Sequence, residues 1–486
     1  MKSIICQKFK AMLAAACLFA GLGAANANNL QITGTSVAGS NITFNISWDN
    51  SWYASLAPGN WDGVWVFVKY QDCSTRQWYH ANLSTTSADH SVGAPLQVDA
   101  VTDGKGVFIH RSAFGAGNIS STAITLKMTI AAGTYNYKVF GVEMVNIPQG
   151  SFDVGDGAST SRFNSINIDA TAQSSGLAST TLGTSVSVPA AYPMGYNSLY
   201  CMKYEITTEQ YMEFLNTLTY DQQKTRTAND PISAAGTYAM TAGYYYRNGI
   251  RISVPGNNNV LPAVYSCDAT AGGGENGTND GQNIPLTSCS WGDLTAYLDW
   301  AALRPMTEIE FEKICRGPVG RVAAEYVWGS TAMTQLNSNN MTNPLQAGEY
   351  YAGTVVNGLC LNGLNSSSTS FGPARAGVFA TSTSGRESAG ATYYGVMDMG
   401  GNVRERVVSA DNASGVAYTG VLGDGTLTTL GDPNQSNWPS PATALGAGDR
   451  GGNWVGVSGE VRTSDRSNAT NTDPYRTYVS GGRGVR

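Results

Sequence analysis

The periodicity of the chain changes near Glu143, and this change constrains the possible folds more than any other sequence feature. Before it, apolar and polar residues alternate along short runs such as 41–48 and 64–70. Alternation with a period of two is typical of half-buried β-strands. After it, long stretches rich in Gly, Asn and Ser surround a few short segments with helical spacing. The chain is therefore predicted to be a loop-rich α+β protein built from two different parts.

The first part, residues 28–141, is predicted to be an antiparallel β-sandwich of immunoglobulin-like type. Clusters of Gly, Asn, Asp and Ser separate its strand signals, and strands with turns between them over about 115 residues favour this architecture. Its tryptophans are predicted to pack in the core or on a sheet, with a sugar platform as the alternative. Further strand signals occupy 106–110, 124–130 and 135–142, and the tryptophans are Trp61, Trp65 and Trp78.

The second part, residues 142–486, is predicted to contain three short helices. Thr207 and Gln210 have the spacing of a capping box at the start of the first helix, over 208–218. Ser290 is expected to cap the second helix, over 291–302. Thr307 with Glu310 opens the third helix, which ends at Gly317-Pro318. The remaining loops are unusually long for a compact domain unless a metal ion, or buried Trp and Arg side chains, holds them in place.

Residues 1–27 are predicted to be a signal peptide. Early lysines precede the apolar run 12–24, and Ala25-Asn26-Ala27 offers the small residues that a signal peptidase requires. The mature protein is therefore predicted to be secreted or on the cell surface. Lipidation at Cys17 is disfavoured because the apolar run continues past it. No later run reaches about 18 apolar residues, so no transmembrane segment is predicted.

Net charge limits the classes of partner that the protein can bind, and the number of cysteines indicates whether disulfides are expected. A formal net charge of −6, with 13% charged residues, argues against nucleic acid as a partner, since phosphate binding needs an excess of Lys and Arg. An even number of cysteines in an exported chain favours disulfides. Zinc is disfavoured because no pair has C-x-x-C spacing. The cysteines beyond the signal peptide are Cys73, Cys201, Cys267, Cys289, Cys315 and Cys360.

Six ordered segments of residues 142–486 resemble the formylglycine-generating enzyme family, also known as sulfatase-modifying factors. The order and number of the segments make the resemblance specific, and it implies a C-type-lectin-like core. The segments are Met144-Val145-Asn146-Ile147-Pro148 with Gly150 and Phe152; Tyr204-Glu205-Ile206-Thr207; Ser290-Trp291 with Trp300; RPMTEIEFE at 304–312; YGVMDMGGNVRE at 394–405; and RGGNW at 450–454 with the closing arginines.

The residues that this family uses for chemistry are missing. Its oxidase is expected to bind copper through two cysteines between the R-G-G-x-W segment and the chain end, but Asn453–Arg486 contains no cysteine. Ser and Thr cannot replace a thiolate as a soft ligand. The related iron-dependent sulfoxide synthases need histidines, and His80, His90 and His110 all lie in the first part. Without a histidine in the second part a Ser-His-Asp triad is also excluded. No catalytic residue is therefore predicted.

Calcium is the one cofactor that the resemblance implies. The family's calcium site maps onto the side chains of Asp398 and Glu405 and onto the backbone carbonyls of Gly401 and Val403. A hard cation prefers several oxygen ligands, and a Gly-Gly turn lets carbonyls converge between two carboxylates. In the alternative interpretation Glu405 pairs with a neighbouring or closing arginine and no metal binds.

A second calcium site of the family is left open. Asn362 and Gly363 match one half of that site. Ser368, a poor calcium ligand, stands where an aspartate is expected. The sequence therefore does not decide whether this site is kept.

Other charged residues of the second part are predicted to be structural. Glu308, Glu310 and Glu312 lie in the first turns of a helix, where carboxylates stabilise the dipole. Neighbours two residues apart face different ways, so they do not form an acid–base pair. Arginine suits bidentate pairing inside a loop-built core. The residues expected to hold the terminal loops in this way are Arg450, Arg462, Arg466 and Arg483, with Trp454.

The sequence thus predicts a non-catalytic, exported surface or secreted protein that uses its scaffold for ligand binding or self-assembly, as in a surface layer or filament. Its partners are predicted to be an extracellular ligand or copies of itself. The stretch 455–481 is rich in Asn, Ser, Thr, Asp and Tyr, which suits recognition loops. The Glu-Pro-Asn and Gln-Pro-Asp triplets of sugar-binding C-type lectins are absent. The alternative is a metal-dependent oxidase of the same superfamily.

Overall fold

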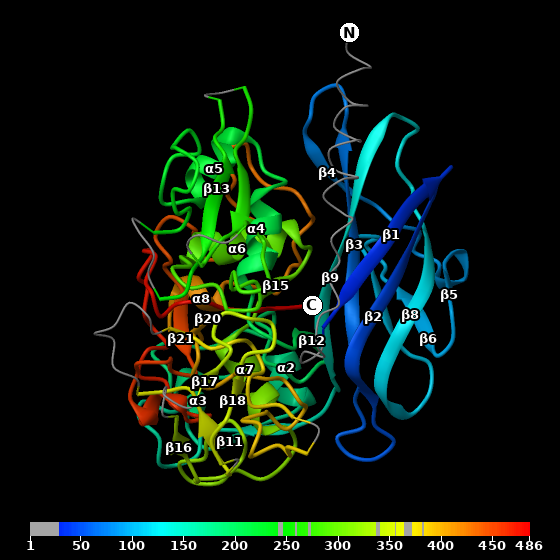
Figure 1. Cartoon of the computed structure of the whole chain (residues 1–486). Coiled ribbons are helices and arrows are strands. Elements are labelled where there is room, and N and C mark those ends of the chain that lie inside the picture. Colours follow the sequence, from blue (N-terminus) through cyan, green and yellow to red (C-terminus); the bar gives the residue numbers. More distant parts are fainter. Residues whose placement is uncertain are drawn as a thin grey trace.

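The computed structural model describes residues 29–241, 246–257, 260–270, 274–336, 341–354, 356–363, 372–381 and 383–486. The predicted signal peptide, and Ser368 of the second calcium site, lie outside the described residues. In Figure 1 a strand-rich part, blue to cyan, lies beside a larger loop-rich part that runs from green to red. The many strands and few short helices confirm the loop-rich α+β class.

Two sheets pack face to face in the N-terminal part. One has the order β1-β2-β8-β5, and the other contains β9-β3-β7-β6 with β4 paired to β3. Both contribute to one core, where Ile42 and Phe44 of β2 lie with Val64 and Val66 of β3. Burying each such side chain stabilises the fold by roughly 1.5–3 kcal/mol, so the alternation decides which face turns inward. The immunoglobulin-like type of this sandwich stays a prediction. The strands are β1 (Gln31–Ala38), β2 (Asn41–Tyr53), β3 (Asp62–Asp72), β4 (Trp78–Ala81), β5 (Ser91–Val92), β6 (Leu96–Ala100), β7 (Val107–Arg111), β8 (Gly115–Lys127) and β9 (Tyr135–Ile147).

The second sheet of the sandwich continues into the loop-rich part. Beyond β9 it adds β12 (Leu199–Met202), β22 (Gly484–Val485) and β15 (Arg304–Pro305), in that order. β9 therefore pairs with β3 on one side and with β12 on the other. The predicted domain boundary at residues 141 and 142 falls inside β9, so one strand belongs to both parts.

Desolvated polar contacts join the two parts. Lys69 of β3 is buried, and its Nζ donates to the carbonyl oxygens of Trp300 at 2.7 Å and Gly425 at 2.8 Å. Burial lowers the pKa of the Lys69 ammonium well below its ordinary value. Arg486 pairs with Asp103 of the sandwich. The sandwich is thus packed onto the loop-rich part and does not hang from it on a linker.

The three tryptophans of the sandwich differ in position. Trp65 is fully buried and its Nε1 donates to the carbonyl oxygen of Ala301 at 2.9 Å, so it is a core residue. Trp61 is half-buried, stacks on His110 at 5.2 Å and donates to the hydroxyl of Tyr200 at 3.0 Å. Trp78 is half-buried in β4. The three do not form one flat platform, because Trp65 is enclosed.

The three predicted helices are present in the loop-rich part, each with its capping box. They are α4 (Thr208–Leu215), α6 (Trp291–Trp300) and α7 (Glu308–Arg316). The structure adds α5 (Tyr220–Arg226), which has its own capping box of Thr219 and Gln222. None of the described helices is long and apolar enough to cross a bilayer. The other elements are α2 (Ala170–Ser175), α3 (Ser179–Leu182), α8 (Ala413–Val416), β10 (Phe152–Val154), β11 (Ile166–Ile168), β13 (Ile250–Val254), β14 (Val264–Cys267), β16 (Thr334–Gln335), β17 (Met341–Thr342), β18 (Tyr350–Tyr351), β19 (Leu359–Cys360), β20 (Glu405–Val408) and β21 (Ala447–Arg450), with the 3₁₀ turns Ser87–Asp89 and Ser458–Val461.

No disulfide joins the five buried cysteines of the described residues, so the disulfides predicted among them are not formed. These free thiols are Cys201, Cys267, Cys289, Cys315 and Cys360. Cys201, Cys315 and Cys360 pack in one hydrophobic cluster, and Cys267 and Cys289 pack in another. Buried free cysteines behave as small apolar side chains, so these five fill the core as single residues.

Candidate functional site

A buried ion-pair network fixes the closing segment of the chain, residues 450–486, against α7. Arg450, at the end of β21, contacts Glu308 at 3.2 Å and Glu312 at 3.1 Å. These glutamates are four residues apart and therefore share one face of the helix. Arg466 donates to both oxygens of Glu308, at 2.7 and 2.9 Å. All four side chains are buried. The network thus ties the terminal loops to the helix.

Most of the other residues predicted to be structural are also buried in the loop core. Arg483 is fully buried and its Nε donates to Glu405 at 2.6 Å. Glu310 faces away from its neighbours and pairs with Arg304. Trp454 is fully buried. Arg462 differs: it is half-buried, and the structure records no ion pair between it and a described residue.

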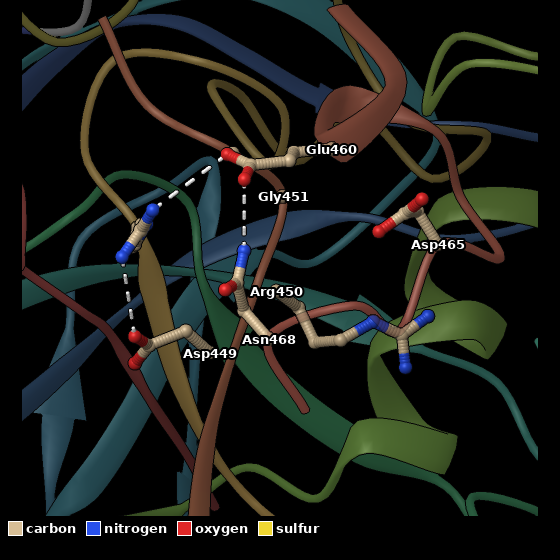
Figure 2. A pocket seen from close by; sticks show the side chains of 8 residues that line it. Asp449, Arg450, Gly451, Glu460, Asp465 and Asn468 are labelled. Atoms are coloured by element: carbon tan, nitrogen blue, oxygen red, sulfur yellow. Dashed lines mark hydrogen bonds and ion pairs between the residues drawn. The ribbon is translucent and has the colours of Figure 1, made fainter. Parts of the chain in front are cut away.

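A small polar pocket lies next to this network, where the chain returns from β21 through the 3₁₀ turn Ser458–Val461 (Figure 2). Arg404 lies between Asp449 at 3.8 Å and Glu460 at 3.7 Å. Asn468 donates to Glu460 at 3.0 Å. Arg404 therefore pairs with two carboxylates of the pocket, and Asp465 adds a third carboxylate to its lining. The donors in the described lining are carboxylates, guanidiniums and an amide.

The sulfur atoms elsewhere in the fold are held as thiols. Burial raises the pKa of Cys201 to about 12 and also raises the pKa of the other four buried cysteines. The thiolate is the form that binds metals and attacks electrophiles. In these five side chains burial therefore favours the thiol over the thiolate.

Each histidine has a hydrogen-bond partner inside the sandwich. The His80 ring lies 2.6 Å from the Lys105 carbonyl oxygen, and the His90 ring lies 3.0 Å from that of Ser84. The His110 ring lies 2.8 Å from the Asp99 carboxylate. Burial lowers the pKa of His80 well below its ordinary value. These hydrogen bonds hold the three histidine rings within the sandwich.

The four predicted calcium ligands lie in one tight turn and the start of β20. Asp398 and Gly401 have φ values of +56° and +82°, so the backbone turns sharply between them. The four residues are buried or nearly so. One oxygen of Glu405 binds Arg483, whereas the other, Oε2, has no hydrogen-bond partner among the described residues. The structure records no hydrogen bond from a described residue to the carbonyl oxygens of Gly401 and Val403.

A third carboxylate, which the sequence reasoning missed, lies beside this turn. Glu205 is fully buried, accepts from the amide nitrogen of Val403 at 3.0 Å and from Asn402 at 2.8 Å. Burial first, and then the charges of Asp398 and Glu405, raise the pKa of Glu205 well above its ordinary value. Burial likewise raises the pKa of Asp398 and of Glu405. The turn is therefore a region of excess negative charge, with Arg483 as its nearest compensation.

These carboxylates do not converge on one point. Among the described residues no three His, Cys, Asp or Glu side chains gather closely enough to hold a metal ion. A cation at this turn would therefore depend on the backbone carbonyls as well as on Asp398 and Glu405.

A larger open groove lies on another face of the loop-rich part. Its volume is about 780 Å³, within the range of small-ligand sites. It is lined by the end of α5, the start of α6 and the loop 474–478 near the chain end. Its floor includes buried residues such as Met240 and Ser288, and its rim includes Tyr475, which is 75% exposed. The predicted recognition stretch 455–481 thus contributes one wall.

Asp293 joins the elements that form the walls of the groove. It is the third residue of α6, is fully buried, and accepts from Arg476 at 2.7 and 2.8 Å. Arg226, on α5, lies 3.5 Å away. Burial works to raise the pKa of Asp293, but the two guanidiniums outweigh it and the pKa lies below its ordinary value. Sequence reasoning missed this residue, although it completes the capping box of Ser290.

Comparison with known proteins agrees with this architecture. The model of the sulfatase-modifying factor enzyme 1-like domain matches residues 136–478, more than two thirds of the chain. The match begins inside β9 and ends in the groove wall. A search of curated proteins finds no match.

Proposed function

The chain belongs to the family of the sulfatase-modifying factor enzyme 1-like domain, and from that premise we propose that it is a non-catalytic member. In this proposal it is exported, by the signal peptide at residues 1–27, and acts at the cell surface or as a secreted protein. It uses the family scaffold to bind a ligand or to assemble with copies of itself.

One observation carries this proposal, namely the set of donors near the closing segment. Asn453–Arg486 contains no cysteine, and the pocket beside Arg450 is lined by paired charges such as Arg404 and Glu460. Copper in an oxidase requires soft thiolate or imidazole ligands. The thiol of Cys315, which interacts electrostatically with Arg450, has a pKa raised by burial and so favours its protonated form. The donor set thus supports a scaffold without oxygen chemistry.

The open groove supports a binding role. Its rim consists of tyrosines on loops, and its walls are held by buried ion pairs of Asp293. Tyrosine offers a large contact area at a small entropic cost, as in other loop-based binders. A rigid wall loses little conformational entropy when a ligand binds. More of the contact energy of the exposed aromatic side chains therefore remains as binding affinity.

The edge of the sandwich supports self-assembly as the second form of this function. β1 lies at the edge of its sheet, and its eight residues QITGTSVA carry no charge and no proline. Such an edge can pair with a strand of another copy. A filament or surface layer would use repeated contacts of this kind.

Calcium is proposed as a structural ligand of this scaffold. Asp398 and Glu405, with the carbonyl oxygens of Gly401 and Val403, would hold it, and the unpartnered Oε2 of Glu405 fits that role. A divalent cation would neutralise the excess negative charge around Glu205. Its contribution would be to fix the turn before β20, with no role in chemistry.

Metal analysis and oxygen uptake test the proposal. We expect the purified mature protein to contain no stoichiometric copper or iron and to consume no oxygen with cysteine-containing peptides. Stoichiometric redox metal together with turnover would instead establish the alternative, a metal-dependent oxidase. Electron microscopy then separates the two forms of the proposal, because filaments or sheets indicate self-assembly and monodisperse particles indicate a soluble binder.

A further inference from the structure

The groove has an aromatic rim that faces solvent. Tyr475 and Tyr478 are 75% and 37% exposed. Tyr246 stacks on Tyr478 with ring centroids 4.4 Å apart and planes at 27°, and it also contacts the buried Trp454 at 5.2 Å. The Tyr478 ring is therefore supported from behind while part of its surface stays open. Flat, supported aromatic faces are suited to stacking against the apolar face of a ring.

The charges in the groove are already balanced. Arg226 and Arg476 are the charged residues of its described lining. Both contact Asp293, and Arg226 also donates to Asp432 at 2.8 Å. Two cations therefore meet two anions. A charged ligand would find no uncompensated charge to pair with, so the groove favours a neutral one.

Hydroxyl groups supply the polar part of the lining. Ser288 and Ser290 belong to the floor, and Thr225 and Thr241 belong to the walls. Ser290 already accepts from the amide nitrogen of Asp293 at 3.1 Å, and Thr225 already donates to the Asp221 carbonyl oxygen at 3.4 Å. Because a hydroxyl both donates and accepts, each of these two keeps one role for a ligand that carries hydroxyls of its own. Arg476 adds donors, because it uses only Nε and Nη2 for Asp293 and is 24% exposed.

The backbone around the groove is held in an uncommon shape. Tyr246 and Ser288 have φ values of +53° and +56°, which L-residues rarely adopt. Arg247 holds the first of these positions through buried contacts with Glu349 and with the Pro373 carbonyl oxygen at 2.7 Å. The amide nitrogen of Ser288 donates to the Thr477 carbonyl oxygen at 3.0 Å. The walls are therefore organised before a ligand arrives.

We propose that this groove binds a neutral oligosaccharide, with Tyr475 and Tyr478 stacking on sugar rings and the hydroxyls of the floor meeting those of the sugar. The inference rests on the proposed binding function and names its ligand class. A peptide fits less well, because none of the described lining residues belongs to a strand that could pair with an extended chain.

The test measures binding of defined tetrasaccharides to the full mature chain by calorimetry. The probes are maltotetraose, cellotetraose, mannotetraose and chitotetraose, with tetragalacturonate as the charged counterpart. Tyr475→Ala and Tyr478→Ala each remove one stacking face and are expected to weaken binding by roughly tenfold. Tyr79→Ala is the matched control, because Tyr79 is 39% exposed and contacts another tyrosine but lies on β4 of the sandwich.

Saturable binding of a neutral tetrasaccharide that is weakened by the groove variants, unaffected by Tyr79→Ala and insensitive to salt supports the inference. Failure of all four neutral probes overturns it, as does binding that the groove variants leave unchanged or preference for tetragalacturonate that disappears in salt. A display library that yields peptides bound at Tyr478 would also overturn the sugar assignment, yet it would leave the proposed binding function standing. Oxygen turnover would remove the proposed function itself.

Discussion

Replacing Arg450 by Met is expected to destabilise the protein by about 3 kcal/mol, because it removes one charge from a buried network. Arg450 contacts Glu308 at 3.2 Å and Glu312 at 3.1 Å, and its Nη2 donates to the Thr463 carbonyl oxygen at 2.7 Å. Removing one member of a buried pair costs roughly 3–5 kcal/mol. The lower end of this range applies to Arg450→Met, because Glu308 still pairs with Arg466 and Glu312 still pairs with Arg316 at 3.1 Å.

Urea unfolding followed by tryptophan fluorescence measures this loss as a shift of the midpoint at constant slope. The double variant Glu312→Gln with Arg450→Met separates charge from packing. If uncompensated charge causes the loss, the double variant should recover part of it, with a coupling energy of about 1–2 kcal/mol. A loss below about 1 kcal/mol for Arg450→Met, or strict additivity in the double variant, would refute the assignment of Arg450 as the residue that holds the closing segment to α7.

Three further predictions concern pH, calcium and sulfur. Burial raises the pKa of Asp299 to about 6 from 3.8, so stability should fall as the pH rises through this window, since the folded chain then holds more protons than the unfolded one. Urea titrations from pH 4 to 7 should show that Asp299→Asn reduces this fall in the free energy of unfolding by about 3 kcal/mol. An equal fall in the variant and the wild type would contradict the raised pKa of Asp299. Calcium at about 100 times its Kd should stabilise the wild type by about 2.7 kcal/mol and should not stabilise Glu405→Gln; equal shifts in both, or none in either, would contradict the site at Asp398 and Glu405. The five buried cysteines, Cys201, Cys267, Cys289, Cys315 and Cys360, should react with iodoacetamide after unfolding without reductant, as checked by peptide mass, whereas unmodified pairs among them would show that disulfides form after all.

Local signals of the sequence predicted local structure well. The capping boxes at Thr207, Ser290 and Thr307 each begin a helix, because their hydrogen bonds close within four residues. The alternation over 41–48 became β2 because burying every second side chain, such as Ile42 and Phe44, decides which face of the strand turns to the core. The helix α5 escaped prediction although Thr219 and Gln222 cap it, since its polar sequence YDQQKTR gives no apolar periodicity.

Contacts between distant residues could not be predicted from these patterns. β12, β22 and β15 are two to four residues long, and only their place beside β9 makes them strands. Asp293 acquires its main partner, Arg476, from 183 residues along the chain. Cysteine parity favoured disulfides, but side-chain packing placed Cys201 and Cys315 in the core as thiols. Spacing along a chain does not report which side chains meet in a core built from loops.

The family resemblance pointed to the turn at Asp398 but did not point to the buried Glu205 beside it. The segment Tyr204–Thr207 was part of the resemblance, and its acidic residue was the available signal. Only the fold brings that carboxylate to within hydrogen-bond distance of the amide nitrogen of Val403, at 3.0 Å. The electrostatics of the turn therefore depend on tertiary structure.

Metal analysis of the purified mature chain, with oxygen uptake measured on the same sample, tests the central claim most directly. We expect copper and iron far below one equivalent and no oxygen uptake with thiol peptides, because the described lining of the pocket beside Arg450 offers carboxylates, guanidiniums and an amide as donors. One equivalent of either metal, retained through dialysis and accompanied by turnover, would contradict it.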